Sequence, residues 1–212
     1  MTQSELFSPH PPDLLHFEKQ GALRGYHIIA GVDEAGRGPL AGPVVAAAVI
    51  LPERLMIDGV TDSKKLSASR RDHLFDLIHQ QALALGVGIG SVELIDRINI
   101  LQATRFAMLE AVSALDPEPD LLLIDGITTI SSPITQKTIK KGDSLSLSIA
   151  AASIIAKVTR DRMMNDLDDL YPGYGLAGHK GYGSAAHLEA ISRLGPSPVH
   201  RLTFSGVREH IR

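Results

Sequence analysis

The sequence contains no cysteine, no long apolar run and no excess of positive charge. Without cysteine, disulfide bonds and thiolate metal sites are excluded, so carboxylates, histidines or carbonyl groups must hold any metal ion. Ligands of this kind favour hard cations, and we expect Mg²⁺ or Mn²⁺. No apolar run is long enough to span a membrane, and the N-terminus lacks a basic stretch followed by an apolar core. We therefore expect a cytoplasmic protein without membrane contact.

The formal net charge of −3 does not favour a nucleic-acid partner at first sight. Net charge is a weak test, because a cluster of catalytic acids lowers the total while basic residues gather on one face. Lysines do gather at residues 63–65, 137–141 and 179–181. Each run is equally compatible with a solvated surface.

The 212 residues suit one domain with a small appendage. Apolar runs predict strands at 27–33, 44–51, 86–92, 121–126 and 134–140, the first two as an antiparallel pair. Helical spacing predicts helices at about 69–85, with Ser69 as cap, and at 100–115, 145–170 and 184–194. This order implies an α/β fold with a mixed sheet flanked by helices. We expect a loose leader or surface wrap (1–25), a catalytic domain (26–171) and a C-terminal extension (172–212).

Two acids stand at the ends of predicted strands. Asp33 and Asp125 each follow an apolar run and precede a glycine-containing loop. Ligand sites in open α/β sheets lie at such strand ends, and the two carboxylates meet if the strands are neighbours. A single acid there is more simply a solvated residue or a helix cap. Glu34 can join Asp33 at one metal only if the strand breaks between or just after them, because neighbouring side chains in a strand point to opposite faces.

Asp143 precedes the alanine-rich helix predicted at 145–170. The helix dipole favours negative charge at this place, so a simple N-cap role competes with a catalytic one. Four converging acids would raise one another's pKa values unless cations were bound. Two metal ions about 4 Å apart would stabilise the attacking and leaving oxygens of a phosphodiester. The residue types alone thus favour a metal-dependent phosphodiesterase.

The segment Gly36, Arg37 and Gly38 is either a plain turn or a place where backbone groups approach a nucleic-acid strand, since glycine has no Cβ. The third glycine of the dinucleotide-binding fingerprint is missing, and no P-loop lysine pattern occurs. A nucleotide-binding fold of either kind is therefore a poor match.

Seven short motifs follow one another between about residues 28 and 204. They are 33–39 (DEAGRGP), 62–67 (DSKKLS), 99–104 (NILQAT), 123–126 (LIDG), 141–143 (KGD), 151–158 (AASIIAKV) and 179–182 (HKGY). In this order they resemble the bacterial ribonuclease HII family. One such motif is weak evidence, whereas seven in order across most of the chain are strong evidence.

The resemblance implies a ribonuclease H-like, mixed five-stranded sheet flanked by helices, with a small C-terminal helical extension. It implies hydrolysis of RNA in RNA–DNA hybrids and cleavage 5′ of single ribonucleotides in duplex DNA, which leaves a 3′-hydroxyl and a 5′-phosphate. The partner would be such a duplex, and we expect a monomer. By matching positions, the metal-binding catalytic acids would be Asp33, Glu34, Asp125 and Asp143.

The resemblance also assigns substrate contacts. The backbone of Gly36, Arg37 and Gly38 would sense the ribose 2′-hydroxyl, which distinguishes RNA from DNA. Tyr182 would stack on the sugar at the RNA–DNA junction. The phosphate backbone would be held by Lys64, Lys65 and Asn99. Ser153 and Lys157 are one helical turn apart and can share a face, which core packing and solvent exposure explain equally well.

Two positions depart from the family pattern, in which Tyr182 is usually followed by proline and Phe204 is usually preceded by serine. Here these positions hold Gly183 and Thr203. About 25 residues precede the first predicted strand, which favours type HII over the related type HIII with its extra N-terminal domain. A non-catalytic hybrid-binding module and another metal-dependent phosphoryl-transfer enzyme are the rival interpretations. The intact set of acids favours an enzyme over the first rival.

Overall fold

The structure is a computed structural model that describes residues 13–53, 55, 57 and 66–211. The α-helices of this part are α1 His16–Ala22, α2 Ala68–Gln81, α3 Val92–Ser113, α4 Leu147–Leu170, α5 Leu176–His179 and α6 Ala185–Leu194. The strands are β1 Ile29–Ala35, β2 Val44–Ile50, β3 Ala84–Gly90, β4 Leu121–Asp125 and β5 Thr135–Ile139. Two short 3₁₀ helices are η3 Gly142–Ser144 and η4 Arg208–His210.

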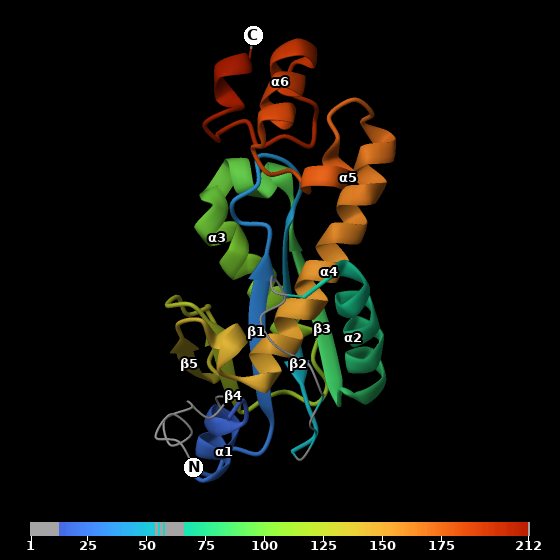
Figure 1. Cartoon of the computed structure of the whole chain (residues 1–212). Coiled ribbons are helices and arrows are strands. Elements are labelled where there is room, and N and C mark those ends of the chain that lie inside the picture. The colour runs from blue at the N-terminus through green and yellow to red at the C-terminus, as the bar shows by residue number, and fades with distance from the viewer. Residues whose placement is uncertain (1–12, 54, 56, 58–65, 212) are drawn as a thin grey trace, which may run out of the picture.

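The five strands form one mixed sheet in the order β3-β2-β1-β4-β5. β1 pairs antiparallel with β2, β2 pairs antiparallel with β3, and β4 lies parallel to both β1 and β5. The predicted mixed five-stranded sheet and its antiparallel first pair are therefore confirmed. Figure 1 shows α5, α6 and the C-terminus beyond the end of the sheet toward which β1 points.

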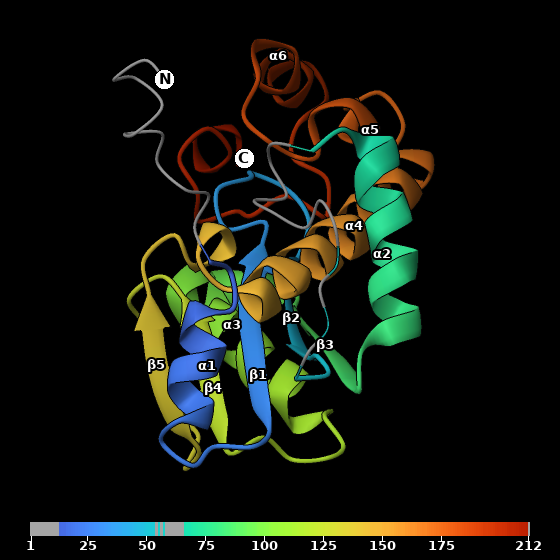
Figure 2. The same cartoon turned by 60° about the horizontal axis from the view of Figure 1, so that its bottom comes forward.

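Helices cover both faces of the sheet, with α4 on one face and α3 on the other (Figures 1 and 2). β2 consists only of valine, alanine and isoleucine, and all of its residues are buried. Ala47 and Val49 pack with the alanine-rich part of α4, while Ala46 and Ala48 pack with α3. Small side chains on both faces let the two helices approach the sheet closely.

The N-terminal segment is not loose throughout, because residues 16–22 form α1. Glu18 ties this helix to the start of α4: its Oε1 accepts hydrogen bonds from Ser146 Oγ (2.7 Å), Ser148 Oγ (2.6 Å) and Ser148 N (3.1 Å). The expectation of a loose leader is thus wrong for residues 13–25. The partners of Glu18 lie about 130 residues away, which explains why local periodicity did not reveal the helix. The domain boundaries themselves remain a prediction.

Several element boundaries differ from those expected. Ser67, not Ser69, caps α2, because Ser67 has the extended backbone that a cap needs and its side chain accepts from Arg70 N (3.2 Å). Leu85 belongs to β3 and not to the preceding helix, and Val92 begins a helix and not a strand. α3 is kinked at Asn99, whose φ is +68°, so the expected start at residue 100 marks the second part of a longer helix.

The C-terminal extension contains α5 as well as the expected helix at 184–194. Among the residues that the structure describes, no helix is long and apolar enough to cross a membrane.

Glycines in β3 bring α3 into direct contact with the strand backbone. A Cβ built on Gly86 would lie 2.0 Å from the carbonyl oxygen of Ala111, and one on Gly88 would lie 2.0 Å from that of Ala107. Glycine alternates with apolar residues in β3 because α3 packs directly against the main-chain atoms of this strand.

Replacing Gly88 by alanine is expected to lower the free energy of unfolding by about 1–3 kcal/mol, because α3 or β3 must shift to admit the methyl group. Urea denaturation measures the change. Gly178→Ala is the matched control, since a Cβ there meets nothing within 4 Å. Equal unfolding midpoints for the two variants would show that α3 is not held against β3.

Candidate active site

Asp33 and Asp125 lie side by side at one edge of the sheet. β1 and β4 are parallel neighbours, and their register pairs Val32 with Ile124, so the next residue of each strand is an aspartate. The condition set by the sequence, that the two acid-bearing strands be neighbours, is met. Two carboxylates at the carboxyl ends of parallel strands form the starting point of the site.

Asp33 is a buried carboxyl group with like charges beside it. It is 4% exposed. Burial raises the pKa of Asp33 well above its usual value, and the negative charges of Glu34 and Asp125 raise the pKa further. Hydrogen bonds from the Ser153 side chain and from Glu34 N (2.7 Å to Oδ1) oppose this rise. A bound cation would relieve the repulsion at this point.

Glu34 continues the strand beyond Asp33. The residues pair regularly with β2, Asp33 with Ala47 and Glu34 with Ala46, so the strand does not break between the two acids. It ends one residue later, where Gly36 has a φ of +96°. The interruption that the sequence required comes just after the pair. Glu34 Oε1 accepts a hydrogen bond from Arg37 Nη1 (3.3 Å).

A backbone hydrogen bond from Gly142 places its neighbour Asp143 close to Asp125. Gly142 N donates a 2.6 Å hydrogen bond to Asp125 Oδ1, and Asp143 is the next residue, 7% exposed within η3. The cap of α4 is Ser146, whose side chain accepts from Ile149 N, so the N-cap interpretation of Asp143 is wrong. Among the described residues, no three histidine, aspartate or glutamate side chains are grouped closely enough to hold one metal ion.

Two buried arginines hold the glycine-rich loop that follows β1. Arg201 donates to the carbonyl oxygens of Gly36 (2.5 Å), Arg37 (2.9 Å) and Gly42 (3.0 and 2.9 Å). Arg160 donates to three further carbonyl oxygens, those of Ala41 (3.0 Å), Pro43 (2.9 Å) and Lys180 (3.0 Å). These bonds join α4 and the C-terminal extension to the loop.

Both arginines are 0–1% exposed, and a Cβ on Gly36 would lie 2.0 Å from Arg160 Nε. Burial lowers the pKa of Arg160 to about 10 and that of Arg201 to about 9, so both remain cationic at neutral pH. Sequence analysis missed both residues. A usable signal was that Arg160 continues the stripe of Ala152 and Ala156 at a spacing of four, on the buried side of α4.

A cavity of about 420 Å³ opens beside these groups. It is lined by Glu34, Ala35, Gly36, Arg37, Gly38, Arg71, Ser153, Lys157, Arg160 and Tyr182. The Tyr182 side chain is half exposed, and a Cβ on Gly38 would lie 3.6 Å from its Cε1. The structure therefore brings together the predicted residues of the glycine loop, Ser153, Lys157 and Tyr182, and adds Arg71 from α2. A larger cavity of about 780 Å³ lies between the start of α3 and the C-terminal extension, and none of Asp33, Glu34, Asp125 and Asp143 lines it.

Asn99 is not among the residues that line the cavity. Its side chain accepts a hydrogen bond from Gln102 N (3.1 Å) and caps the second part of α3. Lys157 Nζ is paired with Asp161 Oδ1 at 2.6 Å. Lys64 and Lys65 lie outside the described residues.

Comparison with known proteins identifies the family. The family model described as Ribonuclease HII matches residues 30–207, most of the chain. The chain belongs to the ribonuclease HII family. It is accordingly a type 2 ribonuclease H, an enzyme that hydrolyses the RNA strand of RNA–DNA hybrids.

Bacterial proteins named Ribonuclease HII are similar to this chain over nearly their whole length. One from Pelobacter propionicus is 68% identical over 211 residues, and the alignment covers 100% of this chain and 96% of the relative. One from Geobacter sulfurreducens is 65% identical, with 97% of this chain and 95% of the relative covered.

Solved structures show the same fold. The ribonuclease H2 of Pyrococcus horikoshii superposes with a TM-score of 0.72 at 29% identity, covering 86% of this chain and 96% of that one. A ribonuclease HII of Archaeoglobus fulgidus, solved in complex with PCNA, also gives 0.72 at 28% identity, covering 84% and 96%.

Replacing Asp33 by asparagine is expected to stabilise the chain at neutral pH in buffer free of divalent ions, because the change removes a buried, repelled charge. The pKa of Asp33 is raised in the folded state. The wild-type chain therefore loses stability as the pH rises above the usual value of 3.8, where the unfolded chain ionises first. The extra stability of Asp33→Asn over the wild-type chain should be absent below pH 3.8 and should grow as the pH rises above it.

Thermal unfolding of both chains from acidic to neutral pH measures this difference. Asp76→Asn, which changes an exposed carboxylate on α2, is the control and should shift the unfolding temperature little. A pH-independent difference between wild type and Asp33→Asn would contradict the raised pKa.

Proposed function

We propose that this ribonuclease cuts on the 5′ side of single ribonucleotides embedded in duplex DNA, as well as within longer RNA–DNA hybrids, with Mg²⁺ or Mn²⁺ as cofactor. The products would carry a 3′-hydroxyl and a 5′-phosphate. The observation that carries the proposal is the position of the Asp33 and Asp125 carboxylates at the sheet edge from which the glycine loop of the cavity continues. We expect the enzyme to act as a monomer in the cytoplasm.

The donor set fits hard divalent cations. Burial raises the pKa of Asp33, and the neighbouring carboxylates of Glu34 and Asp125 raise it further, which a cation would relieve. The chain has no cysteine to compete as a ligand. Asp33 and Asp125 would be the main ligands, and Glu34 and Asp143 would complete the sites. Glu34 would first have to release Arg37. Bound ions would neutralise charge on the scissile phosphate and favour ionisation of the attacking water.

The glycine loop would identify the ribose. Gly38 has no side chain between its backbone and the cavity, where a Cβ would lie 3.6 Å from Tyr182 Cε1, so a 2′-hydroxyl could reach main-chain groups that a larger residue would cover. The absence of a side chain at Gly36 makes room for the Arg160 guanidinium, which holds the loop. Arg201 fixes the carbonyl groups of Gly36 and Arg37, which keeps the remaining groups of the loop in place before substrate arrives. A preformed loop lowers the entropic cost of recognition.

Tyr182 would stack on the sugar at the junction between RNA and DNA, since its half-exposed ring stands at the same cavity. Ser153 reaches Asp33 from α4 and would orient that carboxylate. Lys157 and Arg71 would face the phosphate backbone. Lys64, Lys65 and Asn99 are assigned phosphate contacts by the family resemblance alone.

Replacing Asp125 by asparagine should lower cleavage by at least about 100-fold while the fold and most of the duplex affinity remain, because one metal-binding charge is lost and the shape is kept. The assay uses a DNA duplex containing one ribonucleotide, with Mg²⁺, Mn²⁺ or chelator, and identifies the product ends. Asp116→Asn, an exposed carboxylate after α3, serves as control. Near-normal cleavage by Asp125→Asn would refute its role.

The same assay separates the rival functions. A hybrid-binding module without catalysis would bind this duplex and cut it under no metal condition. Another metal-dependent nuclease would cut an all-DNA duplex of the same sequence equally well. The intact carboxylate set favours cleavage, and the cavity between the glycine loop and Tyr182 favours cleavage next to a ribonucleotide.

Tyr182→Ala is expected to lose about tenfold or more in cleavage at an isolated ribonucleotide, with a smaller loss of duplex affinity, since one stacking contact is worth about 1–3 kcal/mol. Single-turnover cleavage and a filter-binding titration on the same duplex give the two quantities. Equal losses in both would show that Tyr182 contributes only to binding.

A further inference from the structure

Three histidine rings meet behind the loop that carries Tyr182, and they come from three elements. His179 ends α5, His187 lies in the first turn of α6, and His200 lies in the C-terminal tail. The rings of His179 and His187 stack with centroids 4.2 Å apart, and the Nε2 atoms of His187 and His200 are 3.1 Å apart. His187 and His200 are 0% and 1% exposed. The proposed chemistry uses none of the three.

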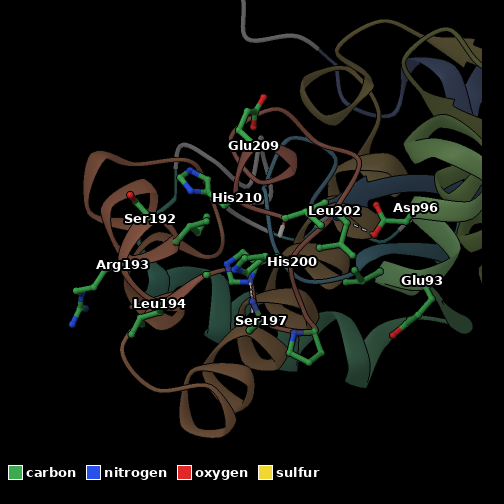
Figure 3. A pocket seen from close by; sticks show the side chains of 16 residues that line it. Glu93, Asp96, Ser192, Arg193, Leu194, Ser197, His200, Leu202, Glu209 and His210 are labelled. Atoms are coloured by element: carbon green, nitrogen blue, oxygen red, sulfur yellow. Dashed lines mark hydrogen bonds between the residues drawn. The ribbon is translucent and has the colours of Figure 1, made fainter.

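The backbone fixes where the protons of this cluster lie. His187 Nδ1 is 2.9 Å from the carbonyl oxygen of Tyr182, which only accepts, so Nδ1 must carry hydrogen. Ser197 N, which only donates, is 3.0 Å from His200 Nδ1, so that nitrogen must be bare and the hydrogen of a neutral His200 is on Nε2. His200 Nε2 then donates to His187 Nε2, which is bare when His187 is neutral. Figure 3 shows Ser197 beside His200.

The tautomer of His179 follows from its hydrogen bonds in the same way. Its Nε2 must donate to the carbonyl oxygen of Tyr174 (2.9 Å), and its Nδ1 must accept from Gly181 N (3.2 Å). All contacts are therefore satisfied at once when the three histidines are neutral. A proton added to His187 or His200 would set two donors against each other.

A metal ion between His187 and His200 is excluded by this pattern. The 3.1 Å separation of the Nε2 atoms would suit two ligands of one ion, but Ser197 N–H leaves His200 protonated on Nε2. A ligand nitrogen must be bare. The cluster is thus a hydrogen-bonded chain that ends on the backbone of Tyr182.

We propose that His187 is a positioning residue for Tyr182, kept in the Nδ1–H tautomer by the hydrogen bond from His200 and in place by the stacked ring of His179. The bond to the Tyr182 carbonyl sets the direction in which the tyrosine ring leaves the loop, beside Gly38. This inference rests on the proposed role of Tyr182 at the ribonucleotide. His187 would therefore affect discrimination between substrates more than the chemical step.

The residue after Tyr182 makes this support necessary. Gly183 stands where the family pattern has proline, and glycine leaves the backbone free where proline would restrict it. The Tyr182 carbonyl also accepts from Ser184 N (2.8 Å), so loss of His187 would not leave it without a partner. The expected result is a misdirected ring and not a collapsed loop.

The electrostatics of the cluster agree with neutral rings. Burial lowers the pKa of His200 to about 4 and also lowers the pKa of His187, and the histidines disfavour charge on one another. Since these values lie below the usual 6.5, the network is complete above pH 6.5 and its contribution to stability is lost as the pH falls toward 4. Other titratable or charged groups around the rings and their loop are Tyr174, Tyr182, Lys180, Arg160 and Arg201, with Glu189 exposed on α6. The cavity that His200 lines adds Glu93, Asp96, Arg193, Glu209 and His210.

Two substitutions of His187 separate hydrogen bonding from packing. His187→Asn keeps an N–H group near the place of Nδ1, whereas His187→Leu keeps the volume and loses the donor. We expect His187→Leu to lower the ratio of cleavage at a single ribonucleotide to cleavage of an uninterrupted RNA strand by about five- to tenfold, the usual effect of one hydrogen bond. His187→Asn should stay within about twofold of wild type.

The control is His210→Leu, a half-buried histidine of the same tail that lines the 780 Å³ cavity outside the chain of three. It should leave the ratio unchanged. Equal losses in His187→Leu and His187→Asn, or no loss in either, would overturn the positioning role.

Nitrogen-15 NMR of the histidines in the wild-type full chain tests the inference without activity. The expected pattern at neutral pH is Nδ1–H for His187 and Nε2–H for His179 and His200. A charged ring or another tautomer for His187 or His200 overturns the proposal even if the variants misfold. If this pattern holds but the enzyme does not distinguish ribonucleotides, a shifted Tyr182 ring signal in His187→Leu alone still supports the positioning role, and an unshifted one refutes it.

Discussion

Two buried guanidinium groups hold together the parts from which the site is built. Arg160 comes from the long helix and Arg201 from the tail, and both donate to carbonyl groups of the loop that follows β1. Carbonyl groups turned inward in this way would be costly to bury without donors. The C-terminal extension is therefore part of the candidate active site, since it supplies Arg201 for the glycine loop and carries Tyr182 to the cavity.

The charged residues around the cavity explain how a chain of net negative charge can attract a polyanionic substrate. Four cations and one carboxylate are among the residues that line the cavity: Arg37, Arg71, Lys157, Arg160 and Glu34. Asp33 is buried next to the lining residue Glu34 in β1, and Asp125 lies at the adjacent strand end. The positive groups would attract phosphates, and the small set of acids among them would bind cations at the same site. The total charge of the chain does not reveal this local arrangement.

Sequence reasoning succeeded where the signal is local. The apolar runs of β1, β2 and β4 predicted the centre of the sheet, and the acids in the last residues of β1 and β4 predicted that Asp33 and Asp125 would meet if these strands were neighbours, as they are. It failed where a residue's role depends on distant partners, as for Glu18, Arg160 and Arg201, each of which bonds backbone or side chains more than 100 residues away. The cap of α2 was predicted wrongly for another reason. Ser67 and Ser69 are the same type of residue, and the extended backbone that makes Ser67 the cap is visible only in the structure.

The parallel pairing of β1 with β4 has a consequence for the order in which the chain folds. Among the elements that the structure describes, only α2 separates β2 from β3, and α3 follows β3 directly, so the contacts among these elements close shorter loops. By contrast, Ile28 and the Asp120 side chain that it bonds are 92 residues apart. Contacts between distant residues form later, because the entropy of closing the long loop must be lost first. The aspartates of the site would then come together only after most of the sheet exists, so a half-folded chain would carry each acid without its neighbour and could not cut nucleic acid.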